Sequence, residues 1–510
     1  MRYTDRDYVL NIASQKLLNQ IEHQKDIFIL SNSTVDGLVG SAILLSSIHN
    51  SKGNTTIRCL NSLKFEDFKI ELMKVVNEKH EFYVFVDFDS KFFDLISSLI
   101  QESYYLFVNS DLCDLDQSID KDKTGTFVNP SIWQRDNDKE SKHTSSSLTY
   151  LIAKNFDRKI IHSSFLPMVA AYSKNIDFNN ADRTELKEIL QSALDLNLIE
   201  GKKGLNFGAS ETTSIVDAIE NNMAHFIKGI TWNKENSLKL LEKSGIQIKD
   251  SKRIRTWKEL EDEDFNKIFN AIEKYIEENG HHSSKSDDNI KDIKKRNRDM
   301  LFGYNYILTN EESDSILKNI GSFSKSLDLC VRNQSFGLGI SICLGDRDDA
   351  IIQIKNQILD YDNLIKSVSN KIFDEKWRFY DDKETIYINA EGILDEKNVD
   401  LFTSILENSV SFADRLICLR ILSTENEEEY KYSLIKPKLA KVDFPKIKKR
   451  IYELAEIHGK LNSNNSGSGL PTITTVTVDI ADKIEIIVPM INLEVFLSNI
   501  KKIVLDAKGF

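Results

Sequence analysis

The chain has 510 residues, with 67 Lys and Arg against 79 Asp and Glu, which gives a formal charge of −12. Hydrophobic residues make up 41% and charged residues 29%, a balance that excludes a collagen, a coiled-coil rod and a chain disordered throughout. The net negative charge argues against a duplex-binding protein that relies on bulk charge. Domains commonly span roughly 100–200 residues, so we expect three domains, or two with a large insertion.

The first third of the chain alternates short apolar runs with helical patterns. Ile27–Leu30, Tyr83–Phe88 and Tyr104–Val108 have the composition of buried strands, and helical segments separate them. This alternation predicts a parallel α/β sheet over residues 1–185. Residues 186–300 are predicted to be mainly helical and to end in a polar linker, His281–Arg298.

A second α/β pattern occupies residues 301–510. It contains a predicted long helix, Asp348–Asp374, and several apolar runs that we interpret as strands. These runs are Gly337–Gly345, Thr385–Leu394, Asp414–Leu422, Tyr430–Lys436 and Thr472–Ile480.

The remaining composition favours a cytoplasmic protein with no membrane segment. The N-terminus carries charges where a signal peptide needs an apolar core, and no run approaches the ~20 apolar residues of a membrane span. Five isolated cysteines without a CxxC pair suit reduced thiols better than a disulfide framework or a zinc site. They are Cys59, Cys113, Cys330, Cys343 and Cys418.

Carboxylates follow each of the first three predicted strands. Asp36, Asp87 and Asp111 stand at or just past the strand ends, where ligands of open parallel sheets collect. Three such acids can converge on one divalent cation, and hard oxygen ligands suit magnesium or manganese. The alternative is that Asp36 caps the following helix and the other two are ordinary turn acids.

Several segments resemble the motifs of the DHH phosphoesterase superfamily. They are SNSTVDGLVGSAILLSSI, YVFVDFD, YYLFVNSDLCD, FVNPSIW and VAAYSKNID. Further blocks across nearly the whole chain resemble archaeal RecJ-like proteins and their counterpart in the eukaryotic replicative helicase. The resemblance implies two α/β lobes, a parallel-sheet DHH domain and a C-terminal DHH-associated domain, with a helical insertion between them.

The departures from the family pattern concern the metal ligands. Neutral residues replace the family's His and Asp ligands at Asn32, Thr34, Asn109 and Ser110. Four carboxylates that match ligand positions remain, Asp36, Asp87, Asp111 and Asp177. The family's two-metal chemistry needs more negative charge than this set supplies. We therefore expect no catalytic residues, no required cofactor and at most one weakly bound magnesium or manganese ion.

The C-terminal lobe carries the most basic run of the chain. A basic groove commonly follows the backbone of single strands, so we expect nucleic-acid contacts here, although a solvated helix face explains the same pattern. The candidate residues are Arg415, Arg420, Lys436, Lys438, Lys441, Lys448, Lys449 and Arg450.

Two functions follow from the resemblance. The first is a catalytically inactive RecJ-like DNA replication factor, a scaffold of the archaeal CMG helicase that binds GINS and MCM and also binds single-stranded DNA. The second is a manganese-dependent single-stranded DNA exonuclease or a small-nucleotide phosphodiesterase of the same superfamily. The incomplete ligand set favours the first.

Overall fold

A computed structural model describes most of the chain, in two compact units. The described residues are 5–60, 65–100, 104–113, 125–133, 143–176, 185–222, 224–250, 253–279, 294–295, 297–382, 385–412, 414–424, 426, 428–437, 440–461, 475–480 and 482–507. One unit comprises residues 1–202 and 305–359, and the other comprises 203–304 and 360–510. The sequence-based boundaries at 185 and 300 had instead grouped residues 305–359 with the C-terminal lobe.

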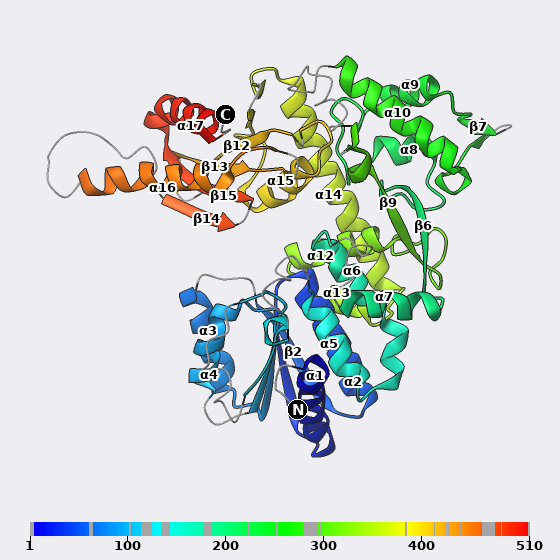
Figure 1. The fold of residues 1–510 in the computed structure, drawn as a ribbon, viewed down its shortest axis with the longest axis vertical. Helices are drawn as coiled ribbons and strands as arrows, with labels where there is room; N and C mark the ends of the chain where they lie inside the picture. Colours follow the sequence, from blue (N-terminus) through cyan, green and yellow to red (C-terminus); the bar gives the residue numbers. More distant parts are fainter. Residues whose placement is uncertain are drawn as a thin grey trace. The chain divides into compact units, whose positions relative to one another are not determined.

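The first unit is built on a five-stranded parallel sheet in the order β2-β1-β3-β4-β5 (Figure 1). Alternate residues of a strand point to opposite faces, so Ile27 and Ile29 of β1 enter one core while Phe28 and Leu30 enter another. Strands this apolar are typical of parallel sheets that are covered on both faces. The strands are β1 (Asp26–Asn32), β2 (Asn54–Leu60), β3 (Phe82–Val86), β4 (Tyr104–Val108) and β5 (Gly125–Val128).

Helices cover both faces of this sheet. In Figure 1, α3 and α4 lie on one face, and α1, α2 and α5 lie on the other. Gly40 lets α2 approach the sheet and α5, because a Cβ atom there would lie 3.0 Å from Val86 and 3.1 Å from Thr149. The helices of the unit are α1 (Arg6–Glu22), α2 (Val35–Asn50), α3 (Phe65–Asn77), α4 (Phe93–Leu99), α5 (Ser145–Lys154), α6 (Leu166–Ser173), α7 (Glu185–Asp195), α12 (Ile320–Arg332), α13 (Phe336–Cys343) and the start of α14 (Asp349–Asp374).

One strand expectation was wrong. The run Gly337–Gly345 lies mostly within the helix α13, because a short, wholly apolar run fits a buried helix and a strand equally well. Gly339 faces α2 so closely that a Cβ atom would lie 2.6 Å from Leu38 Cδ1. Packing against α2 therefore decides the conformation of this run.

The second unit contains a six-stranded mixed sheet in the order β10-β11-β12-β13-β15-β14. Among these described strands, only β11 and β12 pair in parallel. The predicted strands at Thr385, Asp414, Tyr430 and Thr472 all contribute to the sheet, so these expectations are confirmed. The strands are β10 (Phe379–Asp381), β11 (Thr385–Asn389), β12 (Leu416–Leu422), β13 (Glu429–Ile435), β14 (Thr475–Ile480) and β15 (Lys483–Pro489).

This sheet also has a core on each face. Residues of α14 and α15 pack on one face, and residues of α16 and α17 pack on the other. A separate helical cluster forms around Ile268 and Ile272 of α10. The helices and short strands not yet given are α8 (Ile215–Glu220), α9 (Lys234–Ser244), α10 (Asp262–Glu278), α15 (Val399–Glu407), α16 (Phe444–Leu461), α17 (Leu493–Ala507), β6 (Ile199–Leu205), β7 (Lys249–Asp250), β8 (Arg253–Ile254) and β9 (Phe302–Leu308).

Candidate functional site

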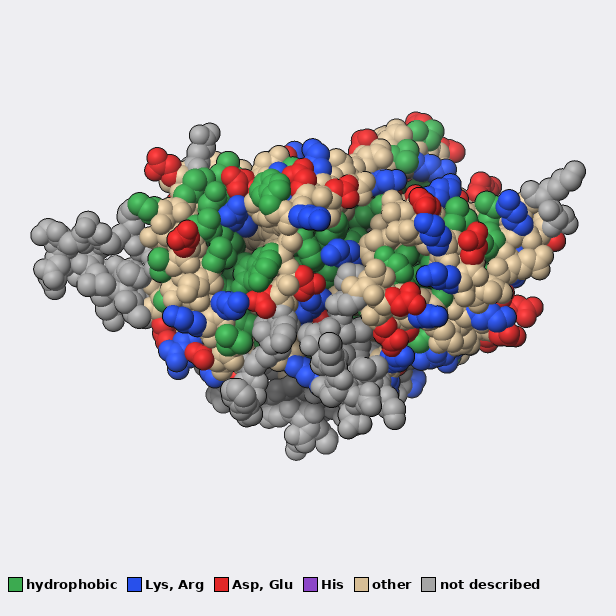
Figure 2. All heavy atoms as spheres, turned by 90° about the horizontal axis from the view of Figure 1, so that it is seen from above, with side chains coloured by type: hydrophobic (Ala, Val, Ile, Leu, Met, Phe, Trp, Pro, Cys, Tyr) green, Lys and Arg blue, Asp and Glu red, His purple; other side chains and the backbone are tan. Residues whose placement is uncertain are grey.

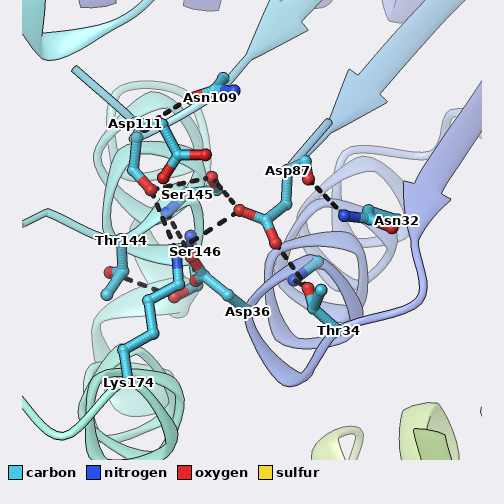
Figure 3. A network of polar contacts seen from close by, with 12 residues as sticks. Asn32, Thr34, Asp36, Asp87, Asn109, Asp111, Thr144, Ser145, Ser146 and Lys174 are labelled. Carbon is cyan, nitrogen blue, oxygen red and sulfur yellow. Dashed lines mark hydrogen bonds and ion pairs between the residues drawn. The ribbon is translucent and has the colours of Figure 1, made fainter. Parts of the chain in front are cut away.

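The carboxyl ends of β1, β3 and β4 carry the acids that the sequence singled out. Asp36 lies in the first turn of α2, Asp87 directly follows β3, and Asp111 lies beyond β4. These strands are neighbours in the sheet, and the three acids stand at one edge of it (Figure 3). Asp177 lies outside the described residues.

Asp36 is held by the beginning of α5. Its carboxylate accepts hydrogen bonds from the backbone N–H groups of Ser145 (2.7 Å) and Ser146 (2.8 Å), which belong to the first turn of the helix. A helix N-terminus favours a negative charge. Burial raises the pKa of Asp36, but Lys174 and the bonds to Ser146 outweigh it and hold the pKa below its ordinary value.

Asp87 accepts two hydroxyl hydrogen bonds. Ser145 Oγ donates to its Oδ1 (2.7 Å) and Thr34 Oγ1 donates to its Oδ2 (2.5 Å). The backbone of Asp87 is left-handed, with φ of 64°, a conformation that costs of order 1 kcal/mol or more in a non-glycine residue. Asn32 Nδ2 donates to the Asp87 carbonyl (2.9 Å) and so supports this turn. Burial raises the pKa of Asp87 to about 6, and repulsion from Asp36 contributes.

Lys174, at the end of α6, places its ammonium among these groups (Figure 3). Its Nζ lies 2.7 Å from Asp36 Oδ2, 3.6 Å from Asp87 Oδ1 and 3.2 Å from Ser110 Oγ. Burial lowers the pKa of Lys174, but attraction to Asp36 and Asp87 outweighs it, so the pKa is raised. The lysine therefore stays charged and offsets one of the two negative charges that the carboxylate pair can carry.

The third motif forms a turn rather than a ligand set. Asn109 Nδ2 donates to the carbonyl of Phe88, and Asn109 Oδ1 accepts from the N–H of Asp111. Asn129 Nδ2 donates to the carbonyl of Asp111 (2.8 Å). Asn109 thus ties the ends of β3 and β4 together, and the charge of Asp111 acts on Lys174.

A divalent metal does not fit this arrangement. No group of three or more His, Cys, Asp or Glu side chains within the described ranges has the geometry of a metal site. The oxygens of Asp36 and Asp87 already accept N–H, O–H and ammonium groups. A divalent cation bound by Asp36 and Asp87 would also lie close to the Lys174 ammonium, and the two positive charges would repel each other. Lys174 supplies the positive charge that the superfamily resemblance assigns to metal.

Sequence reasoning missed Lys174 and the two serines. The resemblance directed attention to Asp177 in the segment VAAYSKNID, which also contains Lys174. The serines belong to the polar run HTSSS before an apolar helix, which is a helix start signal, with Thr144 as the N-cap residue.

A pocket of about 520 Å³ opens beside Lys174 within the first unit. Thr34, Asp36 and Ser173 line it together with Asp328 and Arg332 of α12. Arg332 Nε pairs with Asp328 Oδ2 at 2.7 Å. The pocket wall is therefore polar and balanced in charge.

The predicted nucleic-acid residues are spread over different environments. Arg415 is only 4% exposed and pairs with Asp381 and Asp414, so it offers no surface contact. Arg420 lies on β12, where its Nη2 pairs with Glu391 Oε2 at 3.0 Å.

The basic residues on and near α16 are more accessible. Lys441, Lys449 and Arg450 are exposed, and Lys448 is half-buried. Arg450 pairs with Glu453 at 2.7 Å, and Lys436 pairs with Asp482 at 4.0 Å. Lys438 lies outside the described residues. On the face in Figure 2, Lys and Arg side chains stand among Asp and Glu rather than in one wide basic patch.

Comparison with known proteins gives structural relatives only. No family model and no curated protein sequence matches the chain. The structure of CDC45 from Entamoeba histolytica matches with a TM-score of 0.60 and 12% identity, over 98% of this chain and 99% of that one. An exonuclease RecJ bound to manganese matches with a TM-score of 0.51 and 10% identity, over 97% and 94% of the two chains.

The chain has the two-lobe fold of RecJ and CDC45. The expected similarity to RecJ-like proteins is thereby confirmed at the level of the fold, as is the α/β fold class. The fold also matches RecJ from Thermus thermophilus in complex with Mn²⁺, with a TM-score of 0.51 and 10% identity, over 98% of this chain and 55% of that one. Within the described part of the chain, no helix is long and apolar enough to cross a membrane.

Proposed function

We propose that this RecJ-like chain is a catalytically inactive DNA replication factor, a scaffold of the archaeal CMG helicase that binds GINS and MCM. The observation that carries the loss of activity is the Lys174 ammonium, 2.7 Å from Asp36 and 3.6 Å from Asp87. Two-metal hydrolysis needs carboxylates that are free to bridge two cations. Here the carboxylates neutralise a lysine instead.

The scaffold role is supported by similarity to CDC45 over almost the full length of both chains. A fold by itself does not fix a function, so the test is direct. Purified chain is used to capture GINS and MCM of the same organism, with a manganese- and magnesium-dependent nuclease assay on single-stranded DNA alongside. Capture of both partners without nucleotide release supports the proposal, and metal-dependent release abolished by Asp36→Ala refutes it.

Single-stranded DNA binding by the α16 region is the second part of the proposal. Lys448, Lys449 and Arg450 form its basic end. Reversing these three charges to Glu should weaken strand binding and flatten its salt dependence. The matched control reverses Lys234, Lys239 and Lys243 of α9, which changes the net charge equally. Equal loss in both variants would indicate bulk charge and exclude a specific strand site.

The alternative function is a manganese-dependent exonuclease or small-nucleotide phosphodiesterase. It is favoured by the retained Asp36, Asp87 and Asp111 at the strand ends and by the similarity to an exonuclease RecJ. The same nuclease assay decides between the two functions. A dinucleotide, whose hydrolysis would release mononucleotides, is an additional substrate.

A further inference from the structure

A second pocket, of about 570 Å³, lies entirely within the second unit. Its floor is formed by Tyr387, Cys418 and Tyr432 on the strands β11, β12 and β13, which are adjacent in the sheet. Leu497 and Lys501 of α17 contribute a wall. This volume is in the range of pockets that hold small organic ligands.

Aromatic rings stand at the rim of this pocket. Trp377 is 64% exposed and Tyr380 is 59% exposed, although both are large and apolar. The rings of Tyr380 and Tyr387 lie 6.1 Å apart, and the Arg378 guanidinium lies 4.0 Å from the Trp377 ring centre. Exposed aromatic surface next to a hollow indicates a binding site, and flat rings offer faces on which a planar group stacks.

A buried polar atom lies at the base of the pocket. Tyr432 is only 2% exposed, and its hydroxyl lies next to the Arg420 guanidinium but has no well-aligned hydrogen bond within the described residues. A buried hydroxyl without a complete hydrogen bond is unfavourable, so a ligand atom that completes the bond would be favoured. Arg420 lines the same pocket and uses Nε on Asn389 and Nη2 on Glu391. The Tyr432 hydroxyl and the Arg420 guanidinium can both donate hydrogen bonds, so we expect a ligand that carries hydrogen-bond acceptors.

The charges of the lining favour an anion. Arg378, Arg420 and Lys501 line the pocket beside one lining carboxylate, Asp382, while the carboxylates that pair with Arg378 and Arg420, Glu375 at 2.6 Å and Glu391 at 3.0 Å, are not part of the lining. Lys501 Nζ lies 2.9 Å from Asp382 Oδ2, near the pocket mouth formed with α17. In the left half of Figure 2, hydrophobic side chains stand together with Lys, Arg, Asp and Glu. The pocket therefore combines aromatic rings on which a base can stack, a buried hydrogen-bond donor at Tyr432 and a cation, Lys501, near its mouth.

We propose that this pocket binds a nucleobase together with its phosphate. The base stacks against Trp377 and Tyr380, and a carbonyl oxygen of the base accepts from the Tyr432 hydroxyl. The phosphate lies by Lys501. A base with its phosphate occurs both in a free mononucleotide and in each nucleotide of a single strand. The experiment separates these two ligands. This site is distinct from the Lys174 cluster and does not depend on the scaffold function.

The experiment is calorimetric titration of the full chain with thymidine monophosphate, guanosine monophosphate and an oligothymidylate. Trp377→Ala should weaken binding by about tenfold or more, because stacking contributes about 1–3 kcal/mol per base. Tyr432→Phe keeps the ring and should weaken binding about fivefold through one lost hydrogen bond. Tyr104→Ala, which removes an exposed tyrosine of the other unit, is the control and should bind like the wild type.

The outcomes are distinct. Mononucleotide binding that both variants weaken assigns the pocket to a free nucleotide, whereas oligothymidylate binding alone with the same losses assigns it to a strand. Absence of binding by every probe, or an undiminished affinity in either variant, overturns the proposal. Circular dichroism melting of both variants shows whether they are folded, and Trp377 is exposed enough that its removal should leave the melting temperature unchanged.

Discussion

Lys174 Nζ and Asp36 Oδ2 lie 2.7 Å apart at the carboxyl edge of the parallel sheet, and the Asp36 side chain is only 1% exposed to solvent. The two residues come from the end of α6 and the start of α2. Their pairing belongs to a group in which the Ser145 N–H also donates to Asp36 Oδ2 and the Ser146 N–H donates to the other oxygen, Oδ1. A permanent internal cation thus stands in the place where the superfamily resemblance calls for exchangeable metal.

Replacing Lys174 with Met should destabilise the protein by about 2–3 kcal/mol, because it leaves buried carboxylates without a counter-charge. Urea unfolding measures the loss. The control is Lys154→Met, which removes a lysine paired with Glu188 at 3.6 Å on the more exposed surface of the same unit and should cost well under 1 kcal/mol. Equal losses in the two variants would contradict a special role for Lys174.

Removal of this lysine should also create an affinity for metal. In Lys174→Met with Thr34→Asp, three carboxylates would meet without an ammonium, and Mn²⁺ should raise the melting temperature by stabilising the folded state. The wild type should show no such rise at the same Mn²⁺ concentration. If both proteins respond alike, the ammonium does not exclude metal.

Glu273 of α10 should make the second unit less stable at high pH. Burial raises its pKa to about 7, and Asn297 Nδ2 donates to one oxygen while the other has no partner in the described residues. A carboxyl whose folded pKa exceeds its unfolded value near 4.5 binds more protons when folded, so stability falls as pH rises from about 4.5 to 7.

Glu273→Gln should therefore stabilise the protein by roughly 1–3 kcal/mol at pH 8 and have little effect at pH 5. Denaturant unfolding at the two pH values checks this difference. Glu277→Gln is the control on the same helix, since Glu277 pairs with Lys294 at 2.6 Å and is 40% exposed. A pH-independent effect of Glu273→Gln would show that its proton is not involved.

Gly339→Ala should destabilise the first unit by about 1–3 kcal/mol, because the added methyl group would overlap Leu38 and also approach Cys330 at 3.3 Å. Gly337→Ala in the same helix meets nothing within 4 Å and should stabilise by up to about 1 kcal/mol through helix propensity. Thermal unfolding of the two variants compares them. Similar behaviour of both would argue against the close contact between α13 and α2.

The sequence alone was sufficient for several strands of both sheets, including those at Ile27, Tyr83 and Tyr104, although it missed the apolar strand β15. It also placed Asp36, Asp87 and Asp111 at strand ends. These features depend on local periodicity and on the geometry of parallel strands. Gly337–Gly345 was assigned to the wrong element because its conformation depends on α2, which is distant in sequence.

The tertiary structure decided the chemistry of the site. Which cation meets Asp36 and Asp87 depends on how α6 packs on α2, and no local pattern around Lys174 specifies that contact. The same holds for the Ser145 and Ser146 N–H groups, which reach Asp36 only because α5 begins beside α2. Composition and periodicity report on residues that are close together in the sequence. The partner of a buried charge is instead whichever group the fold brings within a few ångströms of it.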